Sequence, residues 1–331
     1  MKKYDLIIVG AGPAGLAASI YASRYNMNHL VLGQNLGGTI AWAHRIENYP
    51  GFPSISGFEL AQNFLNHAKS LGGKIISQEV VNLKKINGFL VLTAGNKKEY
   101  QAKTLIIATG TKRRKLNVPG EEDYLGKGIS YCATCDAAFY KNKDVVVVGG
   151  ANSACSGALH LARFAKRVYL VYRQNNLRAD PAWVTEAKQT KNITIIYNTN
   201  VTAIEGDGQK VTLIKLDQPY QRKNSLKTTG VFIEIGGAPI VDLAKKLGLK
   251  TDQDDFVITD NLMATNVPGV FCAGDVNAWQ KQCQQVIIAV AEGAIAALGA
   301  YQYLGQPSSK TPWQNKNFFL SLHSGINDKD K

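Results

Sequence analysis

The sequence predicts an α/β protein made of two Rossmann-like dinucleotide-binding domains. The chain has 331 residues, enough for about two domains, and 45% of them are hydrophobic. Two glycine-rich turns, at Gly10 and Gly149, each lie between an apolar run of strand length and a helical pattern. Two distant copies of one βαβ design indicate two similar domains, not a short-period repeat.

The first copy is expected to continue into a small antiparallel sheet. Between residues 75 and 103 the apolar residues alternate, and Asn87-Gly88 and Gly95-Asn96 are typical turn pairs. The other elements expected in the first half are strands at 4–9, 29–32 and 105–110, helices at 13–25 and 57–71, and a loop at 48–53.

The second copy repeats the strand–turn–helix order. Its expected elements are a strand at 144–148, a helix at 152–165, a strand at 167–171, alternating strands through 193–235, and a long helix near 284–303. Residues 306–331, which contain Trp313, Phe318 and Phe319, are expected to be a C-terminal aromatic tail.

Composition limits the location and the partners. No run of about 18 apolar residues and no signal-peptide pattern is evident, and the cysteine number, five, is odd. We therefore expect a cytoplasmic protein without a membrane span. The net charge of +13 favours acidic partners, although a merely solvated basic surface is an equal alternative. No nucleic-acid-binding motif accompanies the charge, so nucleic acid is not an expected partner.

The first glycine turn matches the complete dinucleotide fingerprint. Gly10 permits the tight turn, Gly12 lets the backbone approach a pyrophosphate, and Gly15 lets the helix pack closely on the strand. The helix N-terminus supplies amide donors to the phosphates. No acidic residue ends the next strand, so contact with a ribose must come from elsewhere.

Cys132 and Cys135 form a Cys-x-x-Cys pair upstream of the second turn. At a helix start such a pair lowers one thiol pKa and is suited to redox exchange. Half of a zinc site is the alternative, but it needs two more ligands, and Cys155, Cys272 and Cys283 are isolated. We expect these three cysteines to be small buried residues.

Taken together, these motifs resemble the low-molecular-weight thioredoxin reductase group of FAD-dependent disulfide oxidoreductases. The resemblance spans roughly residues 4 to 305 and includes Gly37-Gly38, Glu47 to Gly51, Ala273 to Asp275 and Lys281-Gln282. It implies that residues 1–117 and 244–305 form a discontinuous FAD-binding domain, with residues 118–243 inserted in it as an NAD(P)-binding-like domain that carries the Cys-x-x-Cys pair. It implies a homodimer that binds FAD and reduces a thioredoxin-like protein disulfide. It also implies that Cys135 faces the flavin, that Cys132 exchanges with the substrate, and that Asp136 shuttles the proton.

The resemblance also implies which residues hold the flavin. They are Gly10, Gly12, Pro13, Ala14, Gly15, Gly38, Asn48, Ala108, Thr109, Gly110, Gly274, Asp275, Lys281 and Gln282, with Trp313 of the tail as a stacking cover. No metal site is expected.

The second turn departs from the pattern of members that use NADPH. They have glycine where this chain has Ala151, and two adjacent arginines where it has Arg173-Gln174. A methyl group obstructs the approach of a pyrophosphate, and an amide does not replace a guanidinium. We therefore expect NADPH to be a doubtful donor and reduced ferredoxin, an acidic protein, to be the better candidate. The alternatives are an NADPH-dependent thioredoxin reductase, a dithiol oxidase, and a member whose inserted domain binds a second flavin.

Overall fold

The computed structural model describes residues 2–279, 281 and 283–305, and its contacts divide them into two compact units. The first unit comprises Met1–Leu36, Asn66–Thr109 and the chain from Val241 onward. The second comprises Gly37–Leu65 and Gly110–Ile240. The domain limits expected from the sequence stay a prediction.

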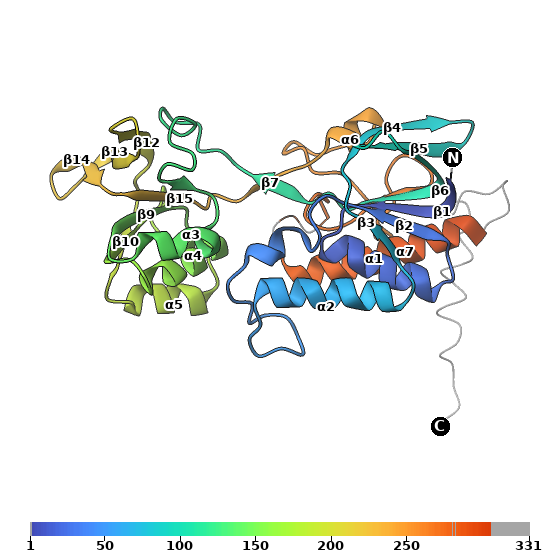
Figure 1. Ribbon diagram of the computed structural model, residues 1–331, viewed down its shortest axis with the longest axis horizontal. Coiled ribbons are helices and arrows are strands. Elements are labelled where there is room, and N and C mark those ends of the chain that lie inside the picture. The colour runs from blue at the N-terminus through green and yellow to red at the C-terminus, as the bar shows by residue number, and fades with distance from the viewer. Residues whose placement is uncertain (1, 280, 282, 306–331) are drawn as a thin grey trace, which may run out of the picture. The chain divides into compact units, whose positions relative to one another are not determined.

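A seven-stranded mixed sheet forms the centre of the first unit (Figure 1). Its strands are β1 (Lys2–Val9), β2 (His29–Leu32), β3 (Lys74–Ile76), β4 (Val80–Ile86), β5 (Phe89–Ala94), β6 (Glu99–Ile107) and β17 (Val270–Cys272). The order is β3-β2-β1-β6-β5-β4, and β17 pairs with β6. Strands β3, β2, β1, β6 and β17 are parallel, whereas β4 and β5 add an antiparallel meander.

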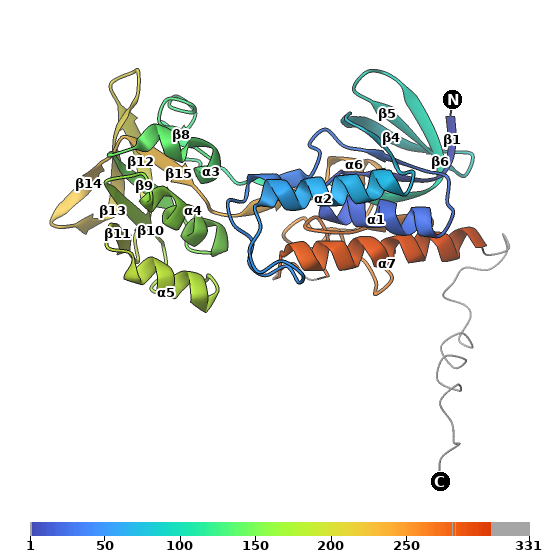
Figure 2. The same ribbon diagram turned by 60° about the horizontal axis from the view of Figure 1, so that its bottom comes forward.

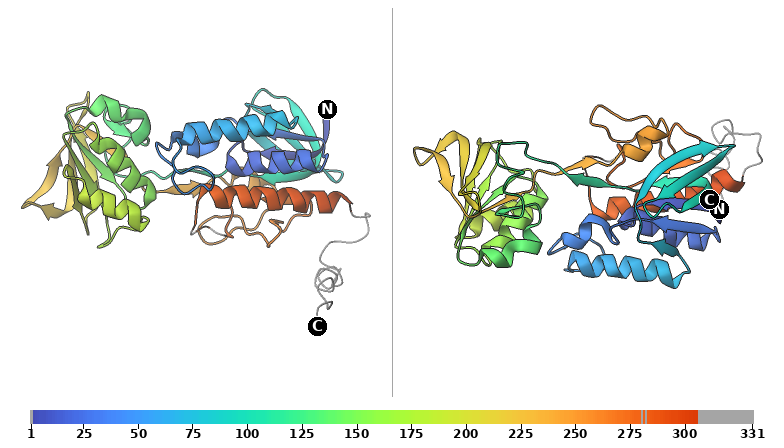
Figure 3. Two further views of the ribbon diagram at one scale, coloured as in Figure 1. Left: turned by 90° about the horizontal axis from the view of Figure 1, so that it is seen from below. Right: turned by 45° about the horizontal axis from the view of Figure 1, so that its top comes forward.

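The helices of this unit begin with α1 (Pro13–Arg24) and end with α7 (Val286–Gly305), which lie side by side in all views (Figures 1 and 3). Between them in the chain come α2 (Gly57–Ser70), which crosses the unit limit, and the short α6 (Asp242–Lys246).

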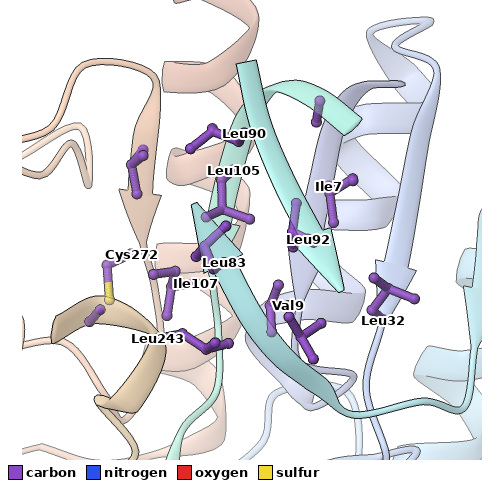
Figure 4. Close-up of a cluster of buried hydrophobic side chains, with 14 of the residues drawn as sticks. Ile7, Val9, Leu32, Leu83, Leu90, Leu92, Leu105, Ile107, Leu243 and Cys272 are labelled. Atoms are coloured by element: carbon purple, nitrogen blue, oxygen red, sulfur yellow. The ribbon is translucent and has the colours of Figure 1, made fainter. Parts of the chain in front are cut away.

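Because side chains alternate along a strand, the parallel strands supply two cores. Leu6, Ile8 and Ile106 belong to the cluster that includes α1 and α7. Ile7, Val9 and Leu105 belong to the opposite cluster with β4, β5 and α6 (Figure 4).

Helix α7 is the one helix among the described residues that is long and apolar enough to cross a membrane. This property was not apparent from the sequence because Glu292 and two glycines interrupt the apolar run. The helix packs along α1, and Ala289, Glu292, Ala296 and Ala300 on that side are buried. A core helix of a folded domain meets the same criterion, so α7 is only weak evidence for a membrane span.

A five-stranded parallel sheet forms the centre of the second unit. Its order is β11 (Ile193–Ile196), β10 (Arg167–Val171), β9 (Asp144–Val148), β15 (Gly230–Ile233) and β8 (Ile129–Ser130). An antiparallel sheet of β12 (Val201–Gly206), β13 (Val211–Tyr220) and β14 (Lys223–Lys227) covers one face, and α3 (Ala133–Asp136), α4 (Asn152–Ala162) and α5 (Pro181–Gln189) cover the other (Figure 2). Strands β7 (Thr111–Arg113) and β16 (Gly237–Pro239) form a separate antiparallel pair, and Gly38–Trp42 and Ala137–Tyr140 are 3₁₀ helices.

The valine run of β9 shows why this unit folds as it does. Val146 and Val148 pack with the antiparallel sheet, whereas Val145 and Val147 pack with the helices. A continuous apolar run is the pattern of a parallel strand that is buried on both faces. The strands expected at 144–148 and 167–171 are confirmed, while α5 was not predicted.

Candidate active site

The first glycine turn has the geometry that its sequence predicts. Gly10 has φ +118°, and a Cβ there would lie 2.0 Å from the Ala108 carbonyl oxygen. A Cβ on Gly15 would lie 1.9 Å from the Gly10 carbonyl oxygen. Neither position can hold a side chain. Gly12 is the N-cap of α1 and Pro13 follows it, without a side-chain cap on the helix amides.

A turn at Gly274, near the C-terminal end of the described chain, packs against the first glycine turn. Gly274 follows β17, and a Cβ on it would lie 2.9 Å from the Cβ of Ala14. The buried Glu292 of α7 accepts a hydrogen bond from the Gly274 amide at 2.7 Å and holds this turn. The structure therefore brings Gly10 to Gly15, Ala108, Thr109, Gly274 and Asp275 together in the first unit.

The acidic groups of this turn are perturbed by burial. Desolvation raises the pKa of Asp275 to about 6. It also raises the pKa of Glu292 to about 7, and the Gly274 amide and Asn277 partly oppose this rise. Among the described residues, none hydrogen-bonds to the Asp275 carboxylate, which is therefore free to accept from a ligand hydroxyl.

These residues fit a flavin dinucleotide. The uncapped amides of α1 suit a pyrophosphate, and the glycines leave room for it. The Asp275 carboxylate suits a ribityl hydroxyl. When bound, the flavin supplies the isoalloxazine ring that accepts and gives up electrons.

For the other predicted flavin contacts, the structure neither supports nor contradicts a place at this turn. Gly38 opens a 3₁₀ helix and Asn48 lies in the loop after it, both in the second unit. Gly110, with φ +67°, also belongs to that unit. Lys281 Nζ pairs with Asp252 at 2.6 Å and with Asp254 at 2.7 Å. Gln282 and Trp313 lie outside the described residues, and all six contacts stay predictions.

The dithiol occupies the start of the four-residue helix α3. Cys132 and Cys135 are joined as a disulfide, with Cα atoms 5.3 Å apart. Cys132 is the N-cap, and its Sγ accepts a hydrogen bond from the Cys135 amide at 3.2 Å. Cys135 is exposed, and Cys132 is half-buried. Asp136 is the last residue of α3, and its charge adds to the burial that raises the pKa of Tyr140.

The remaining cysteines correct one expectation. Cys155 and Cys272 are buried as expected, and burial raises the pKa of both thiols. Cys283 is exposed, so the expectation that it is buried was wrong. It lies just before α7 between Gln282 and Gln284 in the sequence, so no apolar segment carries it into a core. Within the described part of the chain, no cluster of three or more potential ligands could hold a metal ion.

The second glycine turn is formed but altered. Gly149 has φ +143°, and a Cβ on Gly150 would lie 2.4 Å from the Tyr172 ring. Ala151 is the exposed N-cap of α4, so its methyl group stands at the helix amides. Gln174 accepts a hydrogen bond from the Tyr172 hydroxyl at 2.9 Å. Arg173 and Arg178 are exposed.

Two buried carboxylates were missed from the sequence. Glu292 lies in the apolar helix α7, and Glu234 ends the apolar strand β15. A single acidic residue within an apolar run is a readable signal of a buried, partnered charge. Neither Glu234 nor Glu292 was predicted from the sequence to have a role.

Comparisons with known proteins agree with this arrangement. The family model described as pyridine nucleotide-disulphide oxidoreductase matches residues 4–293. A thioredoxin reductase of Listeria innocua is 40% identical over 305 residues, which are 92% of this chain and 94% of that protein. The crystal structure of Lactococcus lactis thioredoxin reductase has a TM-score of 0.87 at 36% identity and covers 91% of this chain and 99% of that one. The crystal structure of a ferredoxin-flavin thioredoxin reductase from Clostridium acetobutylicum has a TM-score of 0.50 at 32% identity. The match covers 92% of this chain and 99% of that one.

Fold and site together define a flavin-dependent disulfide oxidoreductase with two Rossmann-like domains, which confirms the predicted fold class and enzyme class. The chain belongs to the pyridine nucleotide-disulphide oxidoreductase family and is of the thioredoxin reductase type.

Proposed function

We propose that this enzyme passes electrons from reduced ferredoxin through FAD to the Cys132–Cys135 disulfide and then to a thioredoxin-like protein in the cytoplasm. The observation that carries the proposal is the pairing of an intact flavin turn with an altered second turn. The first has the uncapped helix amides that a pyrophosphate needs. The second has the Ala151 methyl group at the same point.

The dithiol geometry supports the assigned roles. Reduction of the disulfide takes up two electrons and two protons. The Cys135 amide points at the Cys132 sulfur, and such a donor stabilises a thiolate there. Cys132 would attack the substrate disulfide, and Cys135 would then attack Cys132, release the reduced substrate and restore the internal disulfide. We propose that Asp136 moves the proton.

The surface beside the disulfide supports a protein substrate. Phe139, four residues after Cys135, is 73% exposed. A large exposed aromatic side chain beside an exposed disulfide sulfur is what a protein partner can cover. A small-molecule disulfide would leave Phe139 in water.

The ferredoxin donor is supported by charge and energy. The chain has a net charge of +13, which favours encounter with an acidic protein. The reduction potential of plant-type ferredoxin, about −400 mV, is lower than that of thioredoxin, about −270 mV. Transfer of two electrons from ferredoxin to thioredoxin is therefore favourable by roughly 6 kcal/mol. The named activity of the Clostridium acetobutylicum neighbour is consistent with this donor on a related fold.

The test is anaerobic bleaching of the flavin absorption band. We expect reduced ferredoxin to bleach it within the mixing time and to do so more slowly as salt rises, because charge screening weakens the encounter. NADPH and NADH at micromolar concentration should leave the band unchanged over minutes. Fast bleaching by NADPH would overturn the proposed donor.

A thioredoxin reductase that uses NADPH is the second candidate. Arg173 and Arg178 remain exposed beside the second turn and suit a 2′-phosphate. The Listeria innocua relative carries the plain name thioredoxin reductase. The same bleaching experiment separates the two candidates.

We also propose a homodimer. The side of α7 away from its buried residues is apolar: Ile287 and Tyr301 are 38% and 46% exposed. Ala291, Ala294 and Leu298 lie between them at helical spacing and are half-buried or exposed. A second copy of the chain would remove this stripe from water.

A further inference from the structure

A buried ion pair lies at the end of strand β15. The Glu234 side chain is only 5% exposed, and its carboxylate contacts Arg113 Nη1 at 2.6 Å. The Arg113 guanidinium also lies over the Trp42 ring, 5.6 Å from its centroid. A buried carboxylate without a cation is costly, so Arg113 is what keeps Glu234 charged there.

The same carboxylate touches the helix that carries the dithiol. Burial raises the pKa of Glu234, and the nearby amide of Ala133, the first residue of α3, acts with Arg113 to oppose this rise. Gly157 of α4 packs against both residues, because a Cβ built on it would lie 3.2 Å from Ala133 Cβ and 3.9 Å from Glu234 Oε1. The carboxylate is thus one residue away from Cys132, at the positive end of α3.

We propose that the Glu234–Arg113 ion pair sets the reduction potential of the Cys132–Cys135 disulfide. Glu234 is a positioning residue that acts through α3 and through its charge. This inference rests on the proposed redox role of Cys132 and Cys135.

The physical argument concerns the reduced form. A thiolate at Cys132 is stabilised by the Cys135 amide, which already points at this sulfur. The Glu234 carboxylate lies beside Ala133, the residue that follows Cys132. Its negative charge opposes a second negative charge nearby, and Arg113 offsets only part of this effect. The other charged group on α3, Asp136, acts in the same direction as Glu234. A less stable reduced form is a stronger reductant, which suits a donor to another protein disulfide.

The test is the potential of the holoenzyme disulfide in thiol redox buffers of graded composition. Glu234→Gln keeps an oxygen for the Ala133 amide, removes the negative charge and leaves Arg113 unbalanced. We expect the equilibrium to shift at least tenfold toward the dithiol, about 30 mV for two electrons. The Cys132 thiol pKa, from the pH profile of alkylation, should fall. All variants carry Cys283→Ser, because that exposed thiol would also be alkylated.

A second variant separates charge from damage to the fold. Glu234→Gln/Arg113→Gln removes both charges and should return the equilibrium to within threefold of the parent. Glu122→Gln removes the exposed carboxylate that pairs with Lys115 and should change nothing. If Glu234→Gln retains FAD but keeps the parent potential, or if the double variant stays as shifted as the single one, the inference is overturned. A normal shift in an enzyme that reduces no protein disulfide would instead refute the proposed function.

Discussion

Gly10 and Gly88 show how much one missing Cβ can decide. Both glycines have positive φ, +118° and +82°. A Cβ on Gly10 would collide with the Ala108 carbonyl, whereas nothing lies within 4 Å of one on Gly88. Substitution at Gly88 therefore carries backbone strain alone, and substitution at Gly10 adds a clash inside the flavin turn.

Gly10→Ala should lose its flavin, with Gly88→Ala as the matched control. We expect Gly88→Ala to cost about 1 kcal/mol of stability and to retain the full flavin content. Gly10→Ala should cost several times more, because β1 and β6 must separate to admit the methyl group. Flavin absorbance per protein and urea unfolding measure both effects. Equal flavin content in the two variants would contradict the role of the turn.

Cys132 and Cys135 should both be indispensable. We expect Cys132→Ser and Cys135→Ser each to abolish reduction of a protein disulfide, by at least about a thousandfold, while FAD stays bound. Cys283→Ser should retain full activity, because this free thiol lies outside the disulfide. Turnover of thioredoxin by either serine variant would exclude the assigned centre.

Two substitutions at the second glycine turn should restore the use of NADPH. Ala151→Gly clears the helix amides, and Gln174→Arg restores a second cation beside Arg173. We expect the double variant to gain at least tenfold in the rate at which NADPH bleaches the flavin, with little gain for NADH. Gln174→Arg alone should gain less, because the methyl group remains. A double variant as slow as the parent would mean that another feature excludes NADPH.

At the scale of elements, the sequence predicted the strands and helices of both glycine turns well. Each of β1, β2, β9 and β10 ends in a run of at least three apolar residues, and a glycine follows the first three of these strands. The sequence could not show that residues 99–107 are one continuous strand, β6. The start of β6 pairs with β5 in the antiparallel meander and its end pairs with β17 in the parallel part, so the two parts have different patterns. Helix α5 was missed because its sequence is polar and only Ala187 is buried.

The same limit applies to the site. The glycines and the dithiol carry local signals, so Gly10, Gly15, Cys132 and Cys135 could be named from the sequence. The roles of Glu234 and Glu292 depend on partners far along the chain, Arg113 and Gly274. No local pattern encodes such a pairing.

Helix α7 should make the stability depend on pH. Burial raises the pKa of Glu292 to about 7, above its value in the unfolded chain. Between about pH 4.5 and 7 the folded protein therefore holds a proton that the unfolded chain releases, and stability falls as pH rises. Glu292→Gln should remove on the order of 3 kcal/mol of this fall. Urea unfolding of the flavin-free proteins at pH 5 and 7.5 measures this change. An equal change in unfolding free energy between the two pH values in the parent and in Glu292→Gln would contradict the assignment.

At the scale of the whole molecule, the apolar stripe on α7 predicts self-association. We expect Ile287→Glu/Tyr301→Glu to convert a dimer into a monomer, because charge on the stripe opposes its burial. Glu replacement of Ile86, which is 42% exposed on β4, is the control and should leave the dimer intact. Sedimentation velocity distinguishes the two. A parent protein that sediments as a monomer would refute the homodimer.

The pairing of β17 with β6 has a consequence for synthesis on the ribosome. The first sheet gains its last strand only when residues 270–272 emerge, and α7 reaches α1 later still. The parallel sheet of the second unit, β8 to β15, spans residues 129–233 without interruption. Domains generally fold as units while the chain is being made. The inserted domain can therefore fold before β17 and α7, which complete the flavin site around the N-terminal glycine turn, have been synthesised. Flavin binding should be among the last steps of folding.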